Sequence, residues 1–328
     1  MFRTSVTRSV LVTWLAAFLA VLAPVPVAQA KFPDRPVKII LPFGAGGVAD
    51  VTARIVADRL SDLLGQRFLV ENMPGAGGIQ AARAVLSAPP DGSTLGLVTN
   101  GTAISAATFS ALPFDPVRDF EMVSTLATFD LVFAVNDASP FKSVADFINA
   151  AKGEPGRLDI GTVSAGSTQN LGAELFKSMA NIDVQIVPYK SSPDIVLALL
   201  RNDVQVMVEF PPALRGQADG KKLRILATSS PSRSPLMPDV PTVAETGLKG
   251  YDVTGWNGVF APKGTPPEVI EIMNRALREV LTMPDVRSRF EQAGVHAVPS
   301  SPAELMARLV TDIKKWSEVA ARAGLQRK

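Results

Sequence analysis

Two glycine-rich loops constrain the fold of this chain most, because each lies between an apolar strand pattern and an amphipathic helix pattern. The first loop spans residues 42–47 and leads into a helical pattern over 50–64; the second spans 74–78 and leads into a helix over 81–86. Strand–loop–helix units in succession predict parallel strands with helices on both faces of the sheet. The chain is therefore expected to be an α/β protein.

Strand and helix patterns continue to alternate beyond these two units. A strand over 131–135 is expected to leave the first unit, and a second series of strands and helices occupies 159–208. An extended segment over 251–260 would return the chain to the first unit. A chain of this length exceeds what a single core usually supports, so we predict two lobes. Lobe 1 is expected to comprise residues 31–130 and 256–328, and lobe 2 residues 131–255.

The first thirty residues have the pattern of a cleavable export signal. Arg3 and Arg8 precede an apolar run over 10–23, and the small-residue sequence Ala28-Gln29-Ala30 follows this run. This run is shorter than the roughly 20 apolar residues that span a membrane. Cleavage after Ala30 is therefore favoured over a retained anchor. Because the chain has no cysteine, we expect a free periplasmic protein without a lipid anchor.

Charge and composition argue against several functions. The full chain has 33 Lys+Arg and 31 Asp+Glu, and removing Arg3 and Arg8 leaves 31 against 31. A neutral mature chain gives no basis for binding nucleic acid or an anionic membrane. Without cysteine, and with His296 as the sole histidine, zinc and thiol chemistry have no support. We predict a protein that is not an enzyme, with no cofactor and no metal, in which His296 is structural.

The glycine loops are best interpreted as an anion site. Glycine allows close backbone approach to a ligand, and the helix N-terminus behind each loop offers unpaired N–H groups and a partial positive charge. The alternative is that both loops are ordinary turns. A dinucleotide site is a second alternative, because Gly44-x-Gly46-x-x-Ala49 with Glu71 matches the relaxed fingerprint. Export and the absence of a hydride-transfer site disfavour it.

A third polar loop, residues 164–170, joins a strand to a helix in the second series. Its hydroxyl and amide groups can donate hydrogen bonds to a carboxylate without adding net charge. Helix capping by serine or threonine is the plainer interpretation of one or two of these residues. Seven small or polar residues in a row exceed what a cap requires.

These motifs together resemble the Bug-type substrate-binding proteins of tripartite tricarboxylate transporters. The resemblance rests on the first loop with Asp50 (residues 42–50), the second loop with its preceding strand end (residues 71–78) and Val187-Pro188-Tyr189-Lys190, and it covers the mature chain. It implies a type II-like periplasmic binding protein. Each lobe would be a mainly parallel sheet flanked by helices, with a ligand cleft between the lobes. In this family, backbone groups and ordered waters largely hold a ligand carboxylate.

Carried onto this chain, the resemblance points to ligand-binding positions in both lobes. Those in lobe 1 are Phe43, Gly44, Gly46, Gly47, Asp50, Gly75, Gly77, Gly78, Asn100 and Thr102, the last two in a turn over 100–102. Those in lobe 2 are Ser164, Gly166, Ser167, Thr168, Asn170, Tyr189, Lys190 and Glu209. We expect Asp50 to cap the helix or order loop water, because a bare acid would repel a carboxylate.

Three positions depart from the family pattern. Asn170 stands where many members have histidine, Glu209 where they have aspartate, and Ser191 where they have glycine. These changes lie where the ligand should be selected, so citrate is not favoured over other acids. The sequence predicts a monomer that binds a di- or tricarboxylate, an amino acid or an aromatic acid and delivers it to membrane permease subunits. A periplasmic sensor with a membrane signalling partner is the main alternative, and an exported α/β enzyme a minor one.

Overall fold

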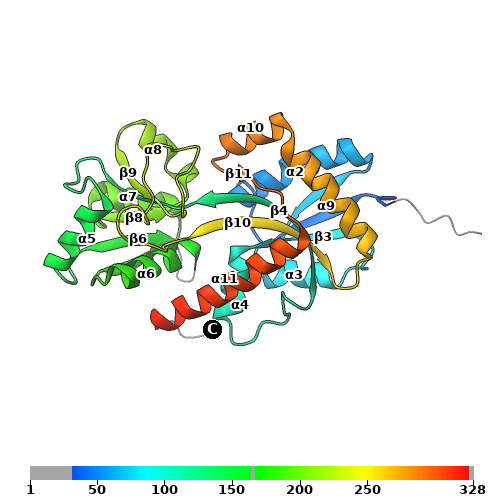
Figure 1. Ribbon diagram of the computed structural model, residues 1–328, viewed down its shortest axis with the longest axis horizontal. Coiled ribbons are helices and arrows are strands. Elements are labelled where there is room, and N and C mark those ends of the chain that lie inside the picture. Colours follow the sequence, from blue (N-terminus) through cyan, green and yellow to red (C-terminus); the bar gives the residue numbers. More distant parts are fainter. Residues whose placement is uncertain (1–31, 164–166, 325–328) are drawn as a thin grey trace, which may run out of the picture.

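The computed structural model describes residues 32–163 and 167–324. The predicted signal peptide and the predicted site residues Ser164 and Gly166 lie outside these ranges. Two bodies of mixed helix and sheet are joined by crossing strands (Figure 1). We call the body with the larger sheet lobe 1 and the other lobe 2.

Lobe 1 is built on a six-stranded sheet in the order β11-β4-β10-β3-β1-β2. The strands β1, β2 and β3 pair in parallel, whereas β10 runs antiparallel to both β3 and β4. Their bounds are β1 (Val37–Leu41), β2 (Phe68–Asn72), β3 (Thr94–Thr99), β4 (Phe120–Asp130), β10 (Thr254–Pro262) and β11 (His296–Ala297).

Helices cover both faces of this sheet, as the sequence predicted. One face carries α2 (Val48–Leu64), α9 (Pro267–Thr282) and α10 (Pro284–Gln292), which share an apolar cluster with β1. The other carries α3 (Ile79–Leu86), α4 (Asn100–Thr108) and α11 (Pro302–Arg322). The two groups lie above and below the strands in Figure 1. Two apolar layers therefore hold the carboxyl ends of β1, β2 and β3 at one edge.

Lobe 2 repeats this design on a five-stranded sheet in the order β7-β6-β8-β5-β9. Its strands are β5 (Val132–Asn136), β6 (Asp159–Val163), β7 (Gln185–Tyr189), β8 (Val206–Glu209) and β9 (Leu223–Thr228). Its helices are α5 (Val144–Gly153), α6 (Thr168–Ala180), α7 (Ser192–Arg201) and the short η3 (Pro211–Ala213) and α8 (Arg215–Asp219). Here β6, β7 and β8 run parallel, and β5 is antiparallel to β8 and β9.

The fold class is confirmed, but the sheets are mixed rather than mainly parallel. The reason lies in the two connections between the lobes. Strand β4 leaves lobe 1 and continues into β5 after Leu131, and β10 brings the chain back. A returning strand must run opposite to the strand that leaves, so β10 is antiparallel to β4, and it also pairs antiparallel with β3 on its other side.

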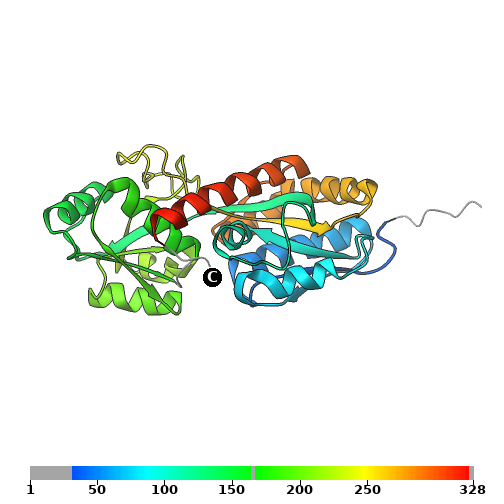
Figure 2. The same cartoon turned by 90° about the horizontal axis from the view of Figure 1, so that it is seen from below.

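A single serine ties the two crossings together. The backbone N–H of Ser229 donates to the carbonyl of Leu131 at 2.9 Å, and its carbonyl accepts from the N–H of Val253 at 3.0 Å. Its hydroxyl donates to the carbonyl of Val253 and accepts from the N–H of Leu131. Seen from below, the lobes lie side by side, with α11 running along lobe 1 to reach α6 of lobe 2 (Figure 2).

The predicted lobe boundaries stay a prediction, although the strands that form each sheet come from the expected parts of the chain. In the part of the chain that the structure describes, no helix combines the length and apolar character that crossing a membrane requires.

Candidate ligand-binding site

The carboxyl ends of six parallel strands define the candidate site. In lobe 1, β1, β2 and β3 lead into α2, into the turn η2 (Ala76–Gly78) with α3, and into α4. In lobe 2, β6, β7 and β8 lead into α6, α7 and η3. Parallel α/β sheets bind ligands beyond these strand ends. A hydrogen bond of 2.6 Å joins the two edges, from Asn100 Nδ2 at the start of α4 to Thr168 Oγ1 at the start of α6.

The first glycine loop is open on its outer side. A Cβ added at Gly44, Gly46 or Gly47 would meet no atom within 4 Å. Gly46 has φ +87°, a left-handed conformation that glycine adopts readily and other residues rarely adopt. Its N–H turns back toward α2 and donates to Asp50 Oδ2 at 2.9 Å. The loop thus presents a backbone surface without side-chain cover, and Phe43 beside it is 40% exposed.

Asp50 braces this loop from behind. Its carboxylate accepts hydrogen bonds from Arg54, whose Nη2 lies 2.9 Å from Oδ1, and from Asn72 Nδ2, also at 2.9 Å. The same Asn72 amide donates to the carbonyl of Phe43 at 3.0 Å. Burial raises the pKa of Asp50, but the hydrogen bonds from Arg54, the Gly46 N–H and Asn72 outweigh it and lower the pKa to about 2. The acid is therefore charged, paired and turned away from an incoming anion.

Arg54 and Asn72 were not among the predicted site residues. The spacing of Asp50 and Arg54, four positions apart on a helix, was a readable signal for their pairing. Asn72 carried no such signal, because its contact with Asp50 depends on β2 lying beside β1.

The second glycine loop is shaped by packing against its own protein. Gly77 and Gly78 have φ +64° and +69°. A Cβ at Gly77 would lie 3.0 Å from the ring of Phe109, and one at Gly78 would lie 3.2 Å from Pro42 Cβ. Pro42 belongs to the first loop, so the two loops are in contact. These glycines are therefore required by the protein's own geometry, whether or not a ligand approaches them.

Residues 100–102, predicted as a turn, are instead the first turn of α4. Thr99 is the N-cap, and Thr102 Oγ1 accepts from the Thr99 N–H at 3.2 Å in a capping box. An Asn-Gly-Thr sequence is typical of a turn. Here the side chains of Thr99 and Thr102 each bond to the backbone of the other residue, and this capping box stabilises a helix start instead. A further helix N-terminus, with buried Asn100 on it, therefore lies at the lobe 1 edge that contacts lobe 2.

In lobe 2 the start of α6 faces the lobe 1 edge, where Thr168 accepts the hydrogen bond from Asn100. Ser167 caps the helix, since its hydroxyl accepts from the Asn170 N–H at 3.1 Å, so the capping interpretation holds for this residue. Thr168 and Asn170 follow on the first turn and are buried. The side chain of Asn170 donates to Thr162 Oγ1 at 3.3 Å. This turn presents amide and hydroxyl groups without a formal charge.

Glu209, at the end of β8, supports this turn. It is 1% exposed. Its carboxylate accepts from Gln169 Nε2 at 2.7 Å, from Ser192 Oγ at 2.7 Å and from the Phe210 N–H at 2.8 Å. The acid thus connects the starts of α6 and α7 and η3. Gln169 lies in the predicted polar loop over residues 164–170, but its pairing with Glu209 was not predicted, because only the fold brings the two together.

Tyr189 and Lys190 lie at the end of β7. The Tyr189 ring packs with the apolar cluster of lobe 2, 3.6 Å from a Cβ added at Gly161, and burial raises its pKa. Lys190 is exposed. In this conformation Tyr189 therefore contributes to lobe packing.

The arrangement suits a small anion. The N-termini of α2, α3 and α4 in lobe 1 and of α6 and α7 in lobe 2 follow the facing strand ends, and helix N-termini carry partial positive charge. Both acids at the site, Asp50 and Glu209, are buried and hydrogen-bonded. Within the described ranges, no group of three or more His, Cys, Asp or Glu side chains is placed to hold a metal ion.

Comparisons with known proteins identify a family for this chain. The model of the tripartite tricarboxylate transporter family receptor, TctC, matches residues 52–325. Protein BugT of Bordetella pertussis is 32% identical over 305 residues, covering 92% of this chain and 94% of BugT. The structure of R. palustris Rpa4515 with adipate is 32% identical, with a TM-score of 0.78 over 90% of this chain and 99% of that one. MatC of Rhodopseudomonas palustris with bound malate is 30% identical, with a TM-score of 0.74 over 88% and 99% of the two chains.

Proposed function

The chain belongs to the tripartite tricarboxylate transporter receptor family, and on that premise we propose that it captures a small carboxylate between its lobes for a membrane permease. The observation that carries the proposal is the pair of facing edges, bridged by Asn100 and Thr168. Each edge consists of helix N-termini and uncharged donors, and the buried acid behind each edge already accepts hydrogen bonds from the protein itself. Two similar proteins hold adipate and malate, which supports a carboxylate as the ligand class.

Family members are periplasmic binding proteins, and we extend this to the present chain with the signal peptide predicted over residues 1–30. The family is a receptor family, so we propose binding without catalysis. Delivery to permease subunits and a monomeric state are further parts of the proposal.

A thermal-shift screen of the mature protein, residues 31–328, tests the ligand class. Adipate, malate, citrate, aspartate and benzoate are compared with adipamide, the uncharged diamide of adipate. A ligand at 100 times its dissociation constant stabilises the folded state by about 2.7 kcal/mol, so at least one acid should raise Tm and the diamide should not. Equal shifts with adipate and adipamide, or no shift with any acid, would contradict the proposal.

A gene deletion distinguishes a role in transport from a role in sensing. If the protein supplies a permease, deleting its gene abolishes uptake of the acid that binds in vitro. Intact uptake with lost induction of the uptake genes would instead identify a sensor.

A further inference from the structure

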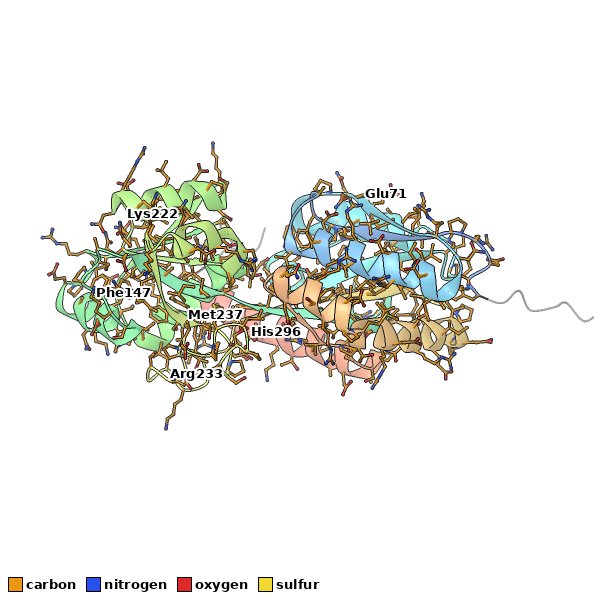
Figure 3. All side chains as sticks on the ribbon, turned by 90° about the horizontal axis from the view of Figure 1, so that it is seen from above. Glu71, Phe147, Lys222, Arg233, Met237 and His296 are labelled. Atoms are coloured by element: carbon orange, nitrogen blue, oxygen red, sulfur yellow. The ribbon has the colours of Figure 1, made fainter. Side chains whose placement is uncertain are left out.

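A second space lies between the lobes, on the other side of the crossing strands from the glycine loops. It is a cavity of about 310 Å³, which we call the hinge pocket. Figure 3 shows His296 and Met237 close together at this side of the interlobe junction, while Glu71, on β2 at the glycine-loop edge, lies on the opposite side. The wall residues come from both lobes and include Asp130, Leu214, Ala218, Met237, Gly294 and His296.

Direct contacts between the lobes border the hinge pocket. Ser234 Oγ of lobe 2 lies 3.1 Å from His296 Nε2 on β11 of lobe 1. Arg215 Nη1 on α8 donates to the carbonyl of Gln292 at the end of α10 at 2.8 Å. At Gly294 a Cβ would lie 3.0 Å from Pro212, so η3 rests on the segment between α10 and β11. The α8 side of lobe 2 therefore already abuts lobe 1.

An aromatic contact adjoins the hinge pocket, because Phe129 and Phe210 each directly precede a wall residue, Asp130 and Pro211. The rings of Phe129 on β4 and Phe210 after β8 meet edge to face, with centroids 5.0 Å apart. Phe210 directly follows Glu209, which supports the first turn of α6 through Gln169. The strand orders of the two sheets place the glycine-loop edge on one side of the crossing strands and the hinge pocket, lined by residues of β9 and β11, on the other.

The position of the hinge pocket couples its volume to the opening of the cleft. Rotation of one lobe about the crossing strands moves groups on opposite sides of those strands in opposite senses. Closing the cleft widens the hinge pocket, and opening the cleft compresses it. Hinge closure of this kind is a common motion of two-lobed binding proteins.

Resting on the proposed function, we propose that the hinge pocket sets ligand affinity by limiting how far the lobes open, and that its wall residues are positioning residues for binding. Ala218 on α8 is the wall residue whose enlargement tests this most directly. A cavity of roughly 150 Å³ already holds a benzene molecule, so the hinge pocket has room for a large side chain. A filled pocket resists compression and therefore disfavours the open form.

The size of the effect follows from population shift. Apparent affinity is reduced by the fraction of molecules in the binding-competent form. If that form is the minor one in the free protein, raising its population lowers the Kd by a factor of about 3 to 10. The effect should grow with side-chain volume in the series Ala218→Leu, Ala218→Phe, Ala218→Trp.

The test uses the mature protein and two readouts. Calorimetric titration with adipate and with malate gives the Kd, and small-angle X-ray scattering gives the radius of gyration without ligand. The matched control is Ala138→Trp, because Ala138 lies just after β5 of lobe 2, is exposed and is not part of the pocket wall. If Ala218→Trp fails to fold, Ala218→Leu carries the test.

We expect Ala218→Trp to lower the Kd and to reduce the radius of gyration of the ligand-free protein, while Ala138→Trp changes neither. A folded Ala218 series with unchanged or raised Kd overturns the proposal, as does an unchanged radius of gyration. If wild type binds neither acid, the carboxylate function loses its support from these probes, but scattering still decides the hinge inference, since it needs no ligand.

Discussion

Replacing Asp50 by asparagine tests the brace behind the first glycine loop. The carboxylate is buried and accepts hydrogen bonds from Arg54, Asn72 and the Gly46 N–H, and these lower its pKa from 3.8 to about 2. At about 1.36 kcal/mol for each pH unit, the difference between the two values corresponds to roughly 2 kcal/mol of stability at neutral pH. Because Arg54 is half exposed, solvent screening makes this an upper value.

The sign of the pH dependence follows from the direction of the pKa change. A carboxyl whose pKa is lowered in the folded state contributes its full stability above 3.8 and loses it as the pH falls through about 2. Urea unfolding at pH 6, 4 and 3 should therefore show Asp50→Asn less stable than wild type by up to about 2 kcal/mol at pH 6. This difference in unfolding free energy should be clearly smaller at pH 3.

Asp58→Asn is the matched control, because Asp58 lies on the same helix with its side chain 70% exposed. It should change stability little at any of these pH values. The difference in unfolding free energy between wild type and Asp50→Asn should depend on pH. A difference that is the same at pH 6 and pH 3, or that Asp58→Asn reproduces, would refute the stabilising role of Asp50 behind the first glycine loop.

Three further predictions concern the site. Gly77→Val should lower unfolding stability by about 1–3 kcal/mol in denaturant titrations, because the side chain meets Phe109 in a left-handed backbone conformation. Gly44→Val, with open space around it and no left-handed φ, should mainly weaken carboxylate binding. Equal stability losses in the two variants would contradict this division. Thr168→Val should raise the Kd measured by calorimetry about tenfold, because it leaves the Asn100 amide without its partner in the other lobe. An unchanged Kd would show that this hydrogen bond does not contribute to binding. Affinity should vary little between about pH 5 and 8, because the Asn170 amide does not titrate where histidine would, and a strong loss over this range would count against Asn170 as a contact.

Local patterns predicted much of the fold. The helix after the first glycine loop was expected over residues 50–64, with Gly65 as its stop, and runs over Val48–Leu64. Apolar spacing and a glycine stop can both be read from the sequence. The long strand β4 (Phe120–Asp130) was not predicted. It is buried along most of its length, so it lacks the alternation of apolar and polar residues that reveals a half-buried strand.

The candidate site was predicted in part, for a similar reason. Glycine loops and helix starts are local features, so their positions could be read directly. The contacts that hold them are not local. Asp50 meets Asn72 across neighbouring strands, Gln169 meets Glu209 between β8 and α6, and Asn100 reaches the other lobe. No spacing in the sequence reports such pairs, because each depends on strand order and on the relative placement of the lobes.

Calorimetric titration of the mature protein with adipate, malate and adipamide tests the central claim most directly, namely that the facing helix starts hold a carboxylate. We expect saturable binding of one ligand molecule per chain for at least one of the two acids, and no measurable binding of the uncharged diamide. Binding of adipamide as tight as that of adipate, or no binding of either acid, would contradict it.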